Sequence, residues 1–261
     1  MLAFAEGAYY FCPVPRFNPE ICIPLRRLIA YISVSVLTIL NSSFSGLPTI
    51  NNSTLAANII VIDPAKDISE KATLLYNELN LEEMGLSEEA FDYAYRGYEY
   101  LLKKKMIAEP DYLTICDFSQ SSKNKRLYLI DLSNNEVVLN TYVAHGRNSG
   151  GEYATRFSNK PSSRQSSLGF YVTKNTYFGE NGLSLRMEGA EPGINDKAYR
   201  RAIVLHGADY IGYGSAGRSY GCPAVPKKES KTIINTIKNG TCLFIYHPQK
   251  KYLQSSKILN D

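Results

Sequence analysis

The sequence lacks the short motifs that mark the commoner nucleotide and zinc sites. It has no GxxxxGK(S/T) phosphate loop, no CxxC pair, no HExxH string and no repeated segment. The sequence also lacks a large excess of charge of one sign, because its 29 basic and 25 acidic residues are interspersed and leave a formal net charge of only +4. We therefore expect neither a nucleic-acid partner nor a metal site, so the chemistry must come from other residues.

The composition does supply the apolar material for a core. Of the 261 residues, 44% are hydrophobic and 21% are charged, which is typical of a globular protein. We therefore expect one enzyme-sized domain with smaller attachments.

An apolar stretch near the N-terminus predicts export of the protein. Arg26 and Arg27 precede the uncharged apolar residues 28–40, and a run of mostly small residues, 41–46, follows. This order is typical of a secretory signal peptide, and the stretch is shorter than the roughly 20 residues that a membrane-spanning helix needs. We expect cleavage near Ser45, with an uncleaved anchor or a buried helix as the alternatives.

The cysteines single out one candidate for chemistry. Cleavage would leave Cys116, Cys222 and Cys242. An odd number leaves at least one thiol unpaired in an exported protein, and such a thiol invites a functional explanation. Cys116 and Cys242 lie in apolar, strand-like runs and are expected in the core, with a disulfide between them as the alternative. Cys222 lies outside these runs and is the candidate nucleophile.

Residues 69–106 have the pattern of two amphipathic helices. Their apolar residues recur mostly at spacings of three or four, which gives each helix one apolar face. Ser87, followed by Glu88 and Glu89, is placed to cap the second helix. We interpret this region as a packing element without a catalytic role.

From Asp111 onward the pattern changes to short β-type runs separated by turn residues. The expected strands are 112–118, 127–132, 136–144, 169–173, 202–205 and 241–246, and 229–238 has helical spacing. The pattern predicts a mainly β (α+β) fold, a β-sandwich or partly open barrel with a helical N-terminal region. The expected divisions are a signal peptide or N-terminal anchor region at 1–45, the helical region at 46–110, the catalytic domain at 111–250 and a C-terminal tail at 251–261.

A histidine and a cysteine lie at the two ends of a glycine-rich loop. His206 follows an apolar run, and Cys222 follows Arg218 and a turn that includes Gly221. A free thiol has a pKa of about 8.5, so it needs a base or a cationic neighbour to act as a nucleophile near neutral pH. His206 can supply the base and Arg218 a positive charge, while Gly221 permits a turn that aims N–H groups at an oxyanion. From spacing alone, a purely structural pair is the alternative.

The string HG…SxGC, formed by 206–207 and 219–222, resembles the catalytic motif of the YkuD-like L,D-transpeptidases. Further segments resemble the murein L,D-transpeptidase catalytic-domain branch of that family, namely 117–119, 126–128, 143–150, 157–159 and 166–171. The resemblance covers about 112–246. Together these segments are far more specific than the histidine and cysteine alone.

The resemblance implies both a reaction and a set of residue roles. Cys222 is implied to attack the carbonyl at the third residue of a peptidoglycan stem tetrapeptide, releasing D-alanine and passing the acyl group to an amine. His206 is then the base and later the acid, the Gly207 carbonyl orients its imidazole, and Ser219 and Gly221 shape the turn. A covalent acyl-enzyme needs no cofactor, and none is expected.

The sequence departs from many relatives beside the nucleophile. Tyr220 stands where they carry histidine, and Ala224 where they carry arginine or asparagine; Tyr220 can still donate a hydrogen bond. His145 and Arg147 are expected to line the substrate cleft, where a guanidinium suits a stem-peptide carboxylate. The alternative for these two residues is a structural turn.

The expected protein is an exported acyltransferase at the periplasmic or outer face of the cell envelope. Peptidoglycan stem peptides are its expected donor and acceptor, with an envelope protein as a possible acceptor and membrane contact only through an uncleaved N-terminal segment. Hydrolysis of the same acyl-enzyme would make it an L,D-carboxypeptidase or cysteine peptidase. A catalytically silent cell-wall-binding module is the alternative from another class.

Overall fold

The computed structural model describes residues 2–5, 8–11, 23–24, 64–211 and 219–261 of the chain. The apolar stretch and the cleavage point of the expected signal peptide lie outside the described residues. The chain divides into two compact units, Met1–Ile59 and Ile60–Asp261. In the first unit, β1 (Leu2–Ala5), β2 (Ala8–Phe11) and β3 (Ile23–Pro24) form an antiparallel sheet.

The second unit is built on one eight-stranded mixed sheet. Its strands are β4 (Tyr112–Asp117), β5 (Leu127–Asp131), β6 (Glu136–Thr141), β7 (Gly169–Gly179), β8 (Gly182–Gly189), β9 (Val204–Ala208), β10 (Ala224–Pro226) and β11 (Cys242–Tyr246). Their order is β10-β9-β8-β7-β11-β4-β5-β6, and only the pairs β10–β9 and β11–β4 are parallel.

The two edges of this sheet meet beyond the end of β6. Ala144 N–H donates to Ala224 O at 2.8 Å, and Ala224 N–H donates back to Ala144 O at 3.3 Å. A second isolated bridge joins Gly146 to Ser219. These bridges nearly close the sheet into a barrel, which confirms the predicted mainly β class and its partly open barrel form.

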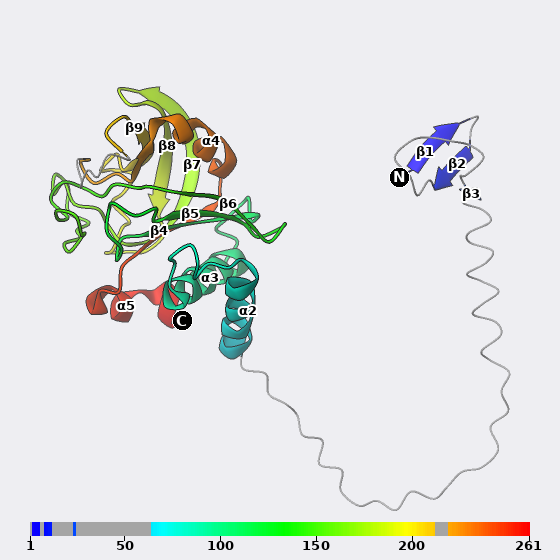
Figure 1. Cartoon of the computed structure of the whole chain (residues 1–261), viewed down its shortest axis with the longest axis horizontal. Helices are drawn as coiled ribbons and strands as arrows, with labels where there is room; N and C mark the ends of the chain where they lie inside the picture. The colour runs from blue at the N-terminus through cyan, green and yellow to red at the C-terminus, as the bar shows by residue number, and fades with distance from the viewer. Residues whose placement is uncertain (1, 6–7, 12–22, 25–63, 212–218) are drawn as a thin grey trace, which may run out of the picture. The chain divides into compact units, whose positions relative to one another are not determined.

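The helices are α2 (Pro64–Glu78), α3 (Glu88–Lys103), α4 (Lys227–Ile237), α5 (Lys250–Ser255) and α6 (Lys257–Asn260). Ser87 caps α3 as predicted, because its side chain accepts from Ala90 N–H at 3.2 Å. Figure 1 shows α2, α3 and α5 grouped beside the sheet, with α4 at its other end. Within the described ranges, no helix has the length and apolar character needed to cross a membrane.

One hydrophobic core joins α2 and α3 to the sheet. A Cβ on Gly97 of α3 would lie 1.9 Å from the ring of Phe170 in β7. That ring stacks on Phe244 of β11 with the centroids 4.1 Å apart. Only glycine lets α3 approach the sheet this closely, so the helix is part of the core and not an appendage on it.

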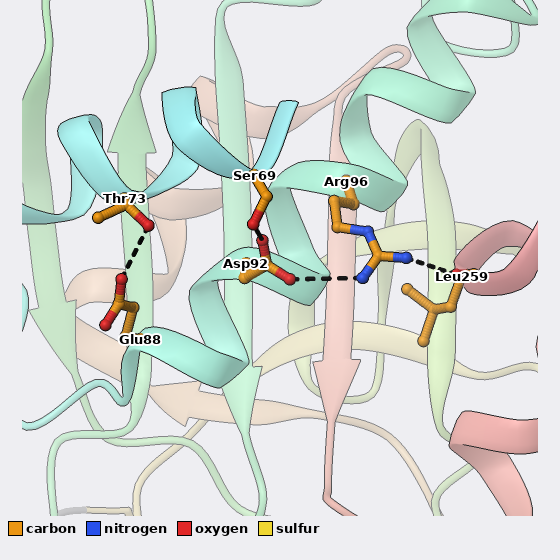
Figure 2. Close-up of polar contacts among 6 residues, drawn as sticks. All are labelled: Ser69, Thr73, Glu88, Asp92, Arg96 and Leu259. Carbon is orange, nitrogen blue, oxygen red and sulfur yellow. Dashed lines mark hydrogen bonds and ion pairs between the residues drawn. The ribbon is translucent and has the colours of Figure 1, made fainter. Parts of the chain in front are cut away.

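Polar contacts fasten α2 and α6 to α3, as Figure 2 shows. Ser69 Oγ of α2 donates to the Asp92 carboxylate of α3 at 2.8 Å. Arg96 lies 3.4 Å from the other oxygen of that carboxylate and donates to Leu259 O of α6 at 2.7 Å. The three helices are thereby joined through side chains of α3.

Cys116 and Cys242 occupy neighbouring strands of the core, and both are fully buried and free. The register pairs Cys242 with Leu113 and Cys116 with Ile245, so the two thiols are offset along the strands and form no disulfide. Burial raises the pKa of Cys116 to about 12 and also raises that of Cys242. The predicted core position of both is confirmed, and both thiols are chemically quiet.

Some elements differ from the prediction. The sequence pattern does not predict β8 or β10, and the expected tail at 251–261 carries α5 and α6. The strand that leads to His206 begins at Val204 and not at Ala202, because Ala202 has φ 53°, a left-handed conformation that interrupts a strand.

Candidate active site

The parallel pairing of β9 with β10 brings the segments of His206 and Cys222 together. Ala224 is the register partner of His206, so Cys222 approaches the beginning of β9. Val204 N–H donates to Cys222 Sγ at 3.5 Å, and Sγ lies 3.7 Å from Ala202 O. Val204 and His206 project from the same face of the strand, because side chains alternate along it. In the described site the thiol bonds to this main chain and makes no hydrogen bond to the imidazole.

The hydrogen bond of His206 fixes which ring nitrogen can accept a proton. Nδ1 lies 3.0 Å from Gly207 O. A carbonyl oxygen can only accept, so Nδ1 carries the hydrogen and Nε2 keeps its lone pair. Burial lowers the pKa of His206, which keeps the ring neutral near pH 7. The buried imidazole is therefore in the form that can act as a base.

Gly207 also lets β9 lie against α4. A Cβ at this position would lie 2.5 Å from Ser230 Oγ and 3.2 Å from Lys227 Cα. The main chain after His206 is therefore fixed by a contact that only glycine permits, and the carbonyl that holds Nδ1 is fixed with it.

The Cys222 thiol is half-buried and protonated at rest. Burial raises its pKa, while the Val204 N–H and the charge of Arg201 act in the opposite direction. Because burial dominates, the thiol does not ionise by itself near neutral pH. A base that takes its proton is needed for nucleophilic attack.

The turn before Cys222 is held by Ser219 and Gly221. Ser219 Oγ accepts from Gly221 N–H at 3.2 Å and donates to Cys222 O at 2.7 Å. Gly221 has φ 120°, and a Cβ there would lie 2.7 Å from Gln165 O. Glycine is therefore required for both the conformation and the close approach.

Segment 158–167 grips this turn from the other side. Ser166 Oγ accepts from Gly146 N–H and donates to Gly221 O, each at 3.0 Å. Arg201, just before β9, holds the same segment with four hydrogen bonds. It donates to Ser158 O at 2.7 Å, Ser167 Oγ at 2.5 Å, Gln165 O at 2.6 Å and Ser163 Oγ at 3.2 Å. Arg201 is not among the predicted site residues, and its only local signal in the sequence is its position shortly before the strand of His206.

Tyr220 lies at the surface among arginines. Its side chain is 62% exposed, and the guanidinium carbons of Arg147 and Arg164 lie 4.7 Å and 5.1 Å from the centroid of its ring. An open cavity of about 570 Å³ is lined by Asn148, Ser162, Arg164, Arg201 and Tyr220. Tyr220 and Arg147 thus lie together near Cys222, and Arg164, which is not among the predicted site residues, contacts the same ring.

His145 does not line this cavity, which corrects the expectation for it. The side chain is fully buried, with Nδ1 2.9 Å from Arg126 Nη2 and Nε2 3.4 Å from Gly150 O. The ring of Phe118 packs edge-on against it, with the centroids 5.9 Å apart. Burial and the Arg126 charge lower the pKa of His145 to about 4, so the ring is neutral. The alternative of a structural residue fits this environment.

The predicted residue Arg218 and the nearby carboxylate of Asp209 are not part of the described site. Arg218 lies in 212–218, outside the described residues. Asp209 is exposed and pairs with Lys227 at 2.8 Å, away from the imidazole. Across the described ranges, no three His, Cys, Asp or Glu side chains gather in a way that could hold a metal ion.

Comparison with known proteins identifies one family. Residues 82–246 match the family described as the L,D-transpeptidase catalytic domain, and this match includes α3. Comparison with curated protein sequences gives no match.

Solved structures of L,D-transpeptidases are similar at low identity. The enzyme from Mycobacterium smegmatis is 10% identical over 52% of this chain and 59% of its own, with a TM-score of 0.35. L,D-transpeptidase 3 from Mycobacterium tuberculosis is 10% identical over 52% and 61%, also with a TM-score of 0.35. The enzyme from Xylanimonas cellulosilytica is 13% identical over 69% and 93%, with a TM-score of 0.32. The chain thus spans less than two thirds of the length of the two mycobacterial enzymes.

Proposed function

Because the chain belongs to the L,D-transpeptidase catalytic domain family, we propose that it is a cysteine-dependent peptidoglycan L,D-transpeptidase. The observation that carries this proposal is the β9–β10 pair, which brings the segments of Cys222 and His206 together, with the thiol on the main chain of β9 and the imidazole bonded to Gly207 O through Nδ1. The motif HG…SxGC supplies both residues.

Acylation uses the lone pair of His206. Nε2 takes the thiol proton as Cys222 Sγ attacks the carbonyl carbon at the third residue of the stem peptide. The C–S bond forms and the C–N bond to D-alanine breaks. The imidazolium returns the proton to the leaving amine, so free D-alanine departs and a thioester remains. For this step the thiol must turn from the main chain of β9 toward the imidazole, as catalytic hydrogen bonds often form only with substrate bound.

Deacylation repeats these steps with an acceptor amine. The amine attacks the thioester, its proton passes to His206 Nε2, and the C–S bond breaks as Cys222 recovers a proton. A new amide joins the acyl group to the acceptor. The Gly207 carbonyl keeps Nδ1 protonated in both half-reactions and favours the imidazolium whenever it forms.

The oxyanion of each tetrahedral intermediate needs a donor near the nucleophile. The N–H of Cys222 makes no hydrogen bond within the described site, whereas the N–H of Gly221 is taken by Ser219 Oγ. We assign the Cys222 N–H to the oxyanion. The turn that Ser219 and Gly221 hold would keep this donor in place before substrate arrives.

Mass spectrometry of the purified protein with a disaccharide tetrapeptide tests the proposal, with Cys222→Ala as the control. Loss of D-alanine with a crosslinked or exchanged product, absent from the control, is the expected result. Tripeptide as the only product would instead make the protein an L,D-carboxypeptidase. Absence of both turnover and a Cys222 adduct would contradict the proposal and favour a silent cell-wall-binding module.

We also propose that the protein is exported and works in the cell envelope. The support is the order of residues 26–46, with two arginines, an apolar stretch and a small-residue run. The donor would be a stem peptide, and the acceptor a second stem peptide or an envelope protein. The mass of the protein recovered from the envelope fraction tests cleavage near Ser45, because an uncleaved chain would keep the full mass.

A further inference from the structure

Three arginines from separate segments lie near the turn that precedes Cys222. Arg147 follows β6, Arg164 belongs to segment 158–167, and Arg201 precedes β9. Arg147 and Arg164 both lie against the ring of Tyr220, and Arg201 lines the same cavity. Tyr220 is two residues before Cys222, and Arg201 Nη2 lies 3.3 Å from the position that a Cβ on Gly221 would take, so the cavity lies near the turn of Cys222.

The three charges are not equally available. Arg201 directs its hydrogen bonds into segment 158–167. Arg147 and Arg164 are exposed, and the contact that the structure shows for each guanidinium is the face of Tyr220. Among the described residues no carboxylate pairs with either. Two like charges that contact the same ring without a counter-ion repel each other, and a bound anion lowers that cost.

The wall that carries Arg164 is fixed in an unfavourable backbone conformation. Ser162 and Arg164 have φ 57° and 56°, the left-handed region that non-glycine residues rarely adopt. Asn148 holds this wall, because its Nδ2 donates to Ser163 O at 2.9 Å and its N–H donates to Arg164 O at 3.1 Å. Because Asn148 directly follows Arg147 in the chain, these bonds couple the positions of Arg147 and Arg164.

We propose that the cavity at Arg147, Arg164 and Tyr220 binds a carboxylate of the acyl-donor peptide, which deepens and rests on the proposed function. A guanidinium pairs with a planar carboxylate through two parallel N–H donors, and the ring of Tyr220 contacts both arginines. The donor carries a free carboxylate on its leaving residue, one residue beyond the bond that Cys222 attacks. The carboxylate of a diamino acid side chain has the same chemistry, and the experiment separates these two sources.

Binding is measured by calorimetry with Cys222→Ala protein and three peptides. These are the tetrapeptide, its C-terminal amide, and a tetrapeptide amidated only at the diamino acid side chain. We expect one of the two amidated peptides to bind about tenfold more weakly than the unmodified tetrapeptide, as loss of a charged hydrogen-bonded pair does. The peptide that binds more weakly identifies the carboxylate held by the cavity. The double variant Arg147→Gln/Arg164→Gln should bind the unmodified tetrapeptide about tenfold more weakly than the parent protein does. It should bind the peptide whose amidation weakened binding no more weakly than the parent protein binds that same peptide. Lys231→Gln, which removes one exposed charge on α4, is the charge control.

Tyr220 provides a second readout that unfolding does not mimic. Tyr220→Phe keeps the ring and should keep the preference for the acid, whereas Tyr220→Leu should lose most of it. Equal binding of the acid and both amides to the parent protein would overturn the proposal, as would undetectable binding of all three. Equal losses for acid and amide in the double variant would also overturn it.

The two proposals fail separately. A wild-type protein that binds the acid through the arginines but never releases D-alanine would retain the carboxylate site and lose the transpeptidase function. A protein that turns over the tetrapeptide and both of its amides equally well would retain the function and lose the site.

Discussion

At the scale of single residues, the chemistry depends on which atoms of His206 and Cys222 carry a proton. Burial lowers the pKa of the imidazole and raises that of the thiol, so both groups are neutral near pH 7. This state favours the proposed general-base mechanism over a resting thiolate–imidazolium pair. The two arrangements predict different pH dependence.

We expect kcat/KM for D-alanine release to fall on acidification only below the ordinary histidine pKa of about 6.5. Burial lowers the pKa of His206, and the imidazole stops acting as a base only once it is protonated. Iodoacetamide labelling of Cys222 should instead keep rising above pH 8.5, since it needs the thiolate and burial raises that pKa. Cys116 and Cys242 are buried and should not interfere. Fast labelling at pH 6 would show an ion pair and contradict this expectation.

Gly221 gives a second prediction at this scale. Gly221→Ala forces a side chain into the left-handed region and against Gln165 O, so we expect a loss of roughly 1–3 kcal/mol in the free energy of unfolding and at least a tenfold loss of activity. The matched control is Gly182→Ala, whose φ is 75° but whose Cβ meets nothing within 4 Å. Urea unfolding measures both variants. Equal effects of the two substitutions on activity would contradict a special requirement at Gly221.

At the scale of elements, local pattern predicts those parts of the fold whose cause is local. The strands β4, β5 and β11 are nearly continuous apolar runs, and α3 begins at a capping serine, so each is visible in the sequence. β10 has three residues and exists because β9 lies beside it, while α5 and α6 dock through Tyr252 and Ser256 on buried Glu191. Such long-range contacts produce no local pattern of apolar residues from which these elements could be predicted.

The same distinction divides the site. His206, Gly207 and Cys222 belong to one short motif, and sequence suffices to propose them. Arg201 acquires its position from partners 34 to 43 residues away, and nothing in its neighbourhood specifies them. His145 resembles a cleft residue in sequence, but in the structure it is buried together with Arg126, which bonds to its Nδ1.

Arg201 connects segment 158–167 to the beginning of β9, and its charge acts on the thiol. Arg201→Gln should therefore raise the pKa of Cys222 and slow its labelling at pH 8 by several-fold, as one unit of pKa changes the thiolate fraction about tenfold. Arg201→Lys keeps the charge but not the planar set of N–H donors. Its labelling rate should therefore be closer to the wild-type rate than that of Arg201→Gln, while segment 158–167 should remain less stable than in the wild type. Labelling rates from pH 7 to 10 give the shift. A variant with slower labelling but an unchanged pKa would show a structural role alone.

At the scale of the whole molecule, the candidate site lies on the seam where the sheet edges meet. Strand β11 is hydrogen-bonded to a strand on each side, β7 on one and β4 on the other. The seam instead consists of isolated bridges at Ala144–Ala224 and Gly146–Ser219. Among the described residues, the turn of Cys222 therefore belongs to the least extensively paired part of the barrel, while His206 lies on a strand paired to both β8 and β10.

This arrangement predicts uneven stability across the sheet. Amides of the seam, such as those of Ala144 and Ala224, should exchange with deuterium at least about tenfold faster than those of Phe244 in β11, because opening the seam breaks few hydrogen bonds and exposes little of the core. Acylation of Cys222 should slow exchange at the seam and leave β11 unchanged, since the acyl group adds contacts only on one side. Exchange measured by mass spectrometry on peptides covering 142–148, 219–226 and 242–246 makes this comparison. Uniform protection of the three peptides would mean that the barrel is closed as firmly at the seam as at its centre, and that the nucleophile's turn opens only with the whole fold.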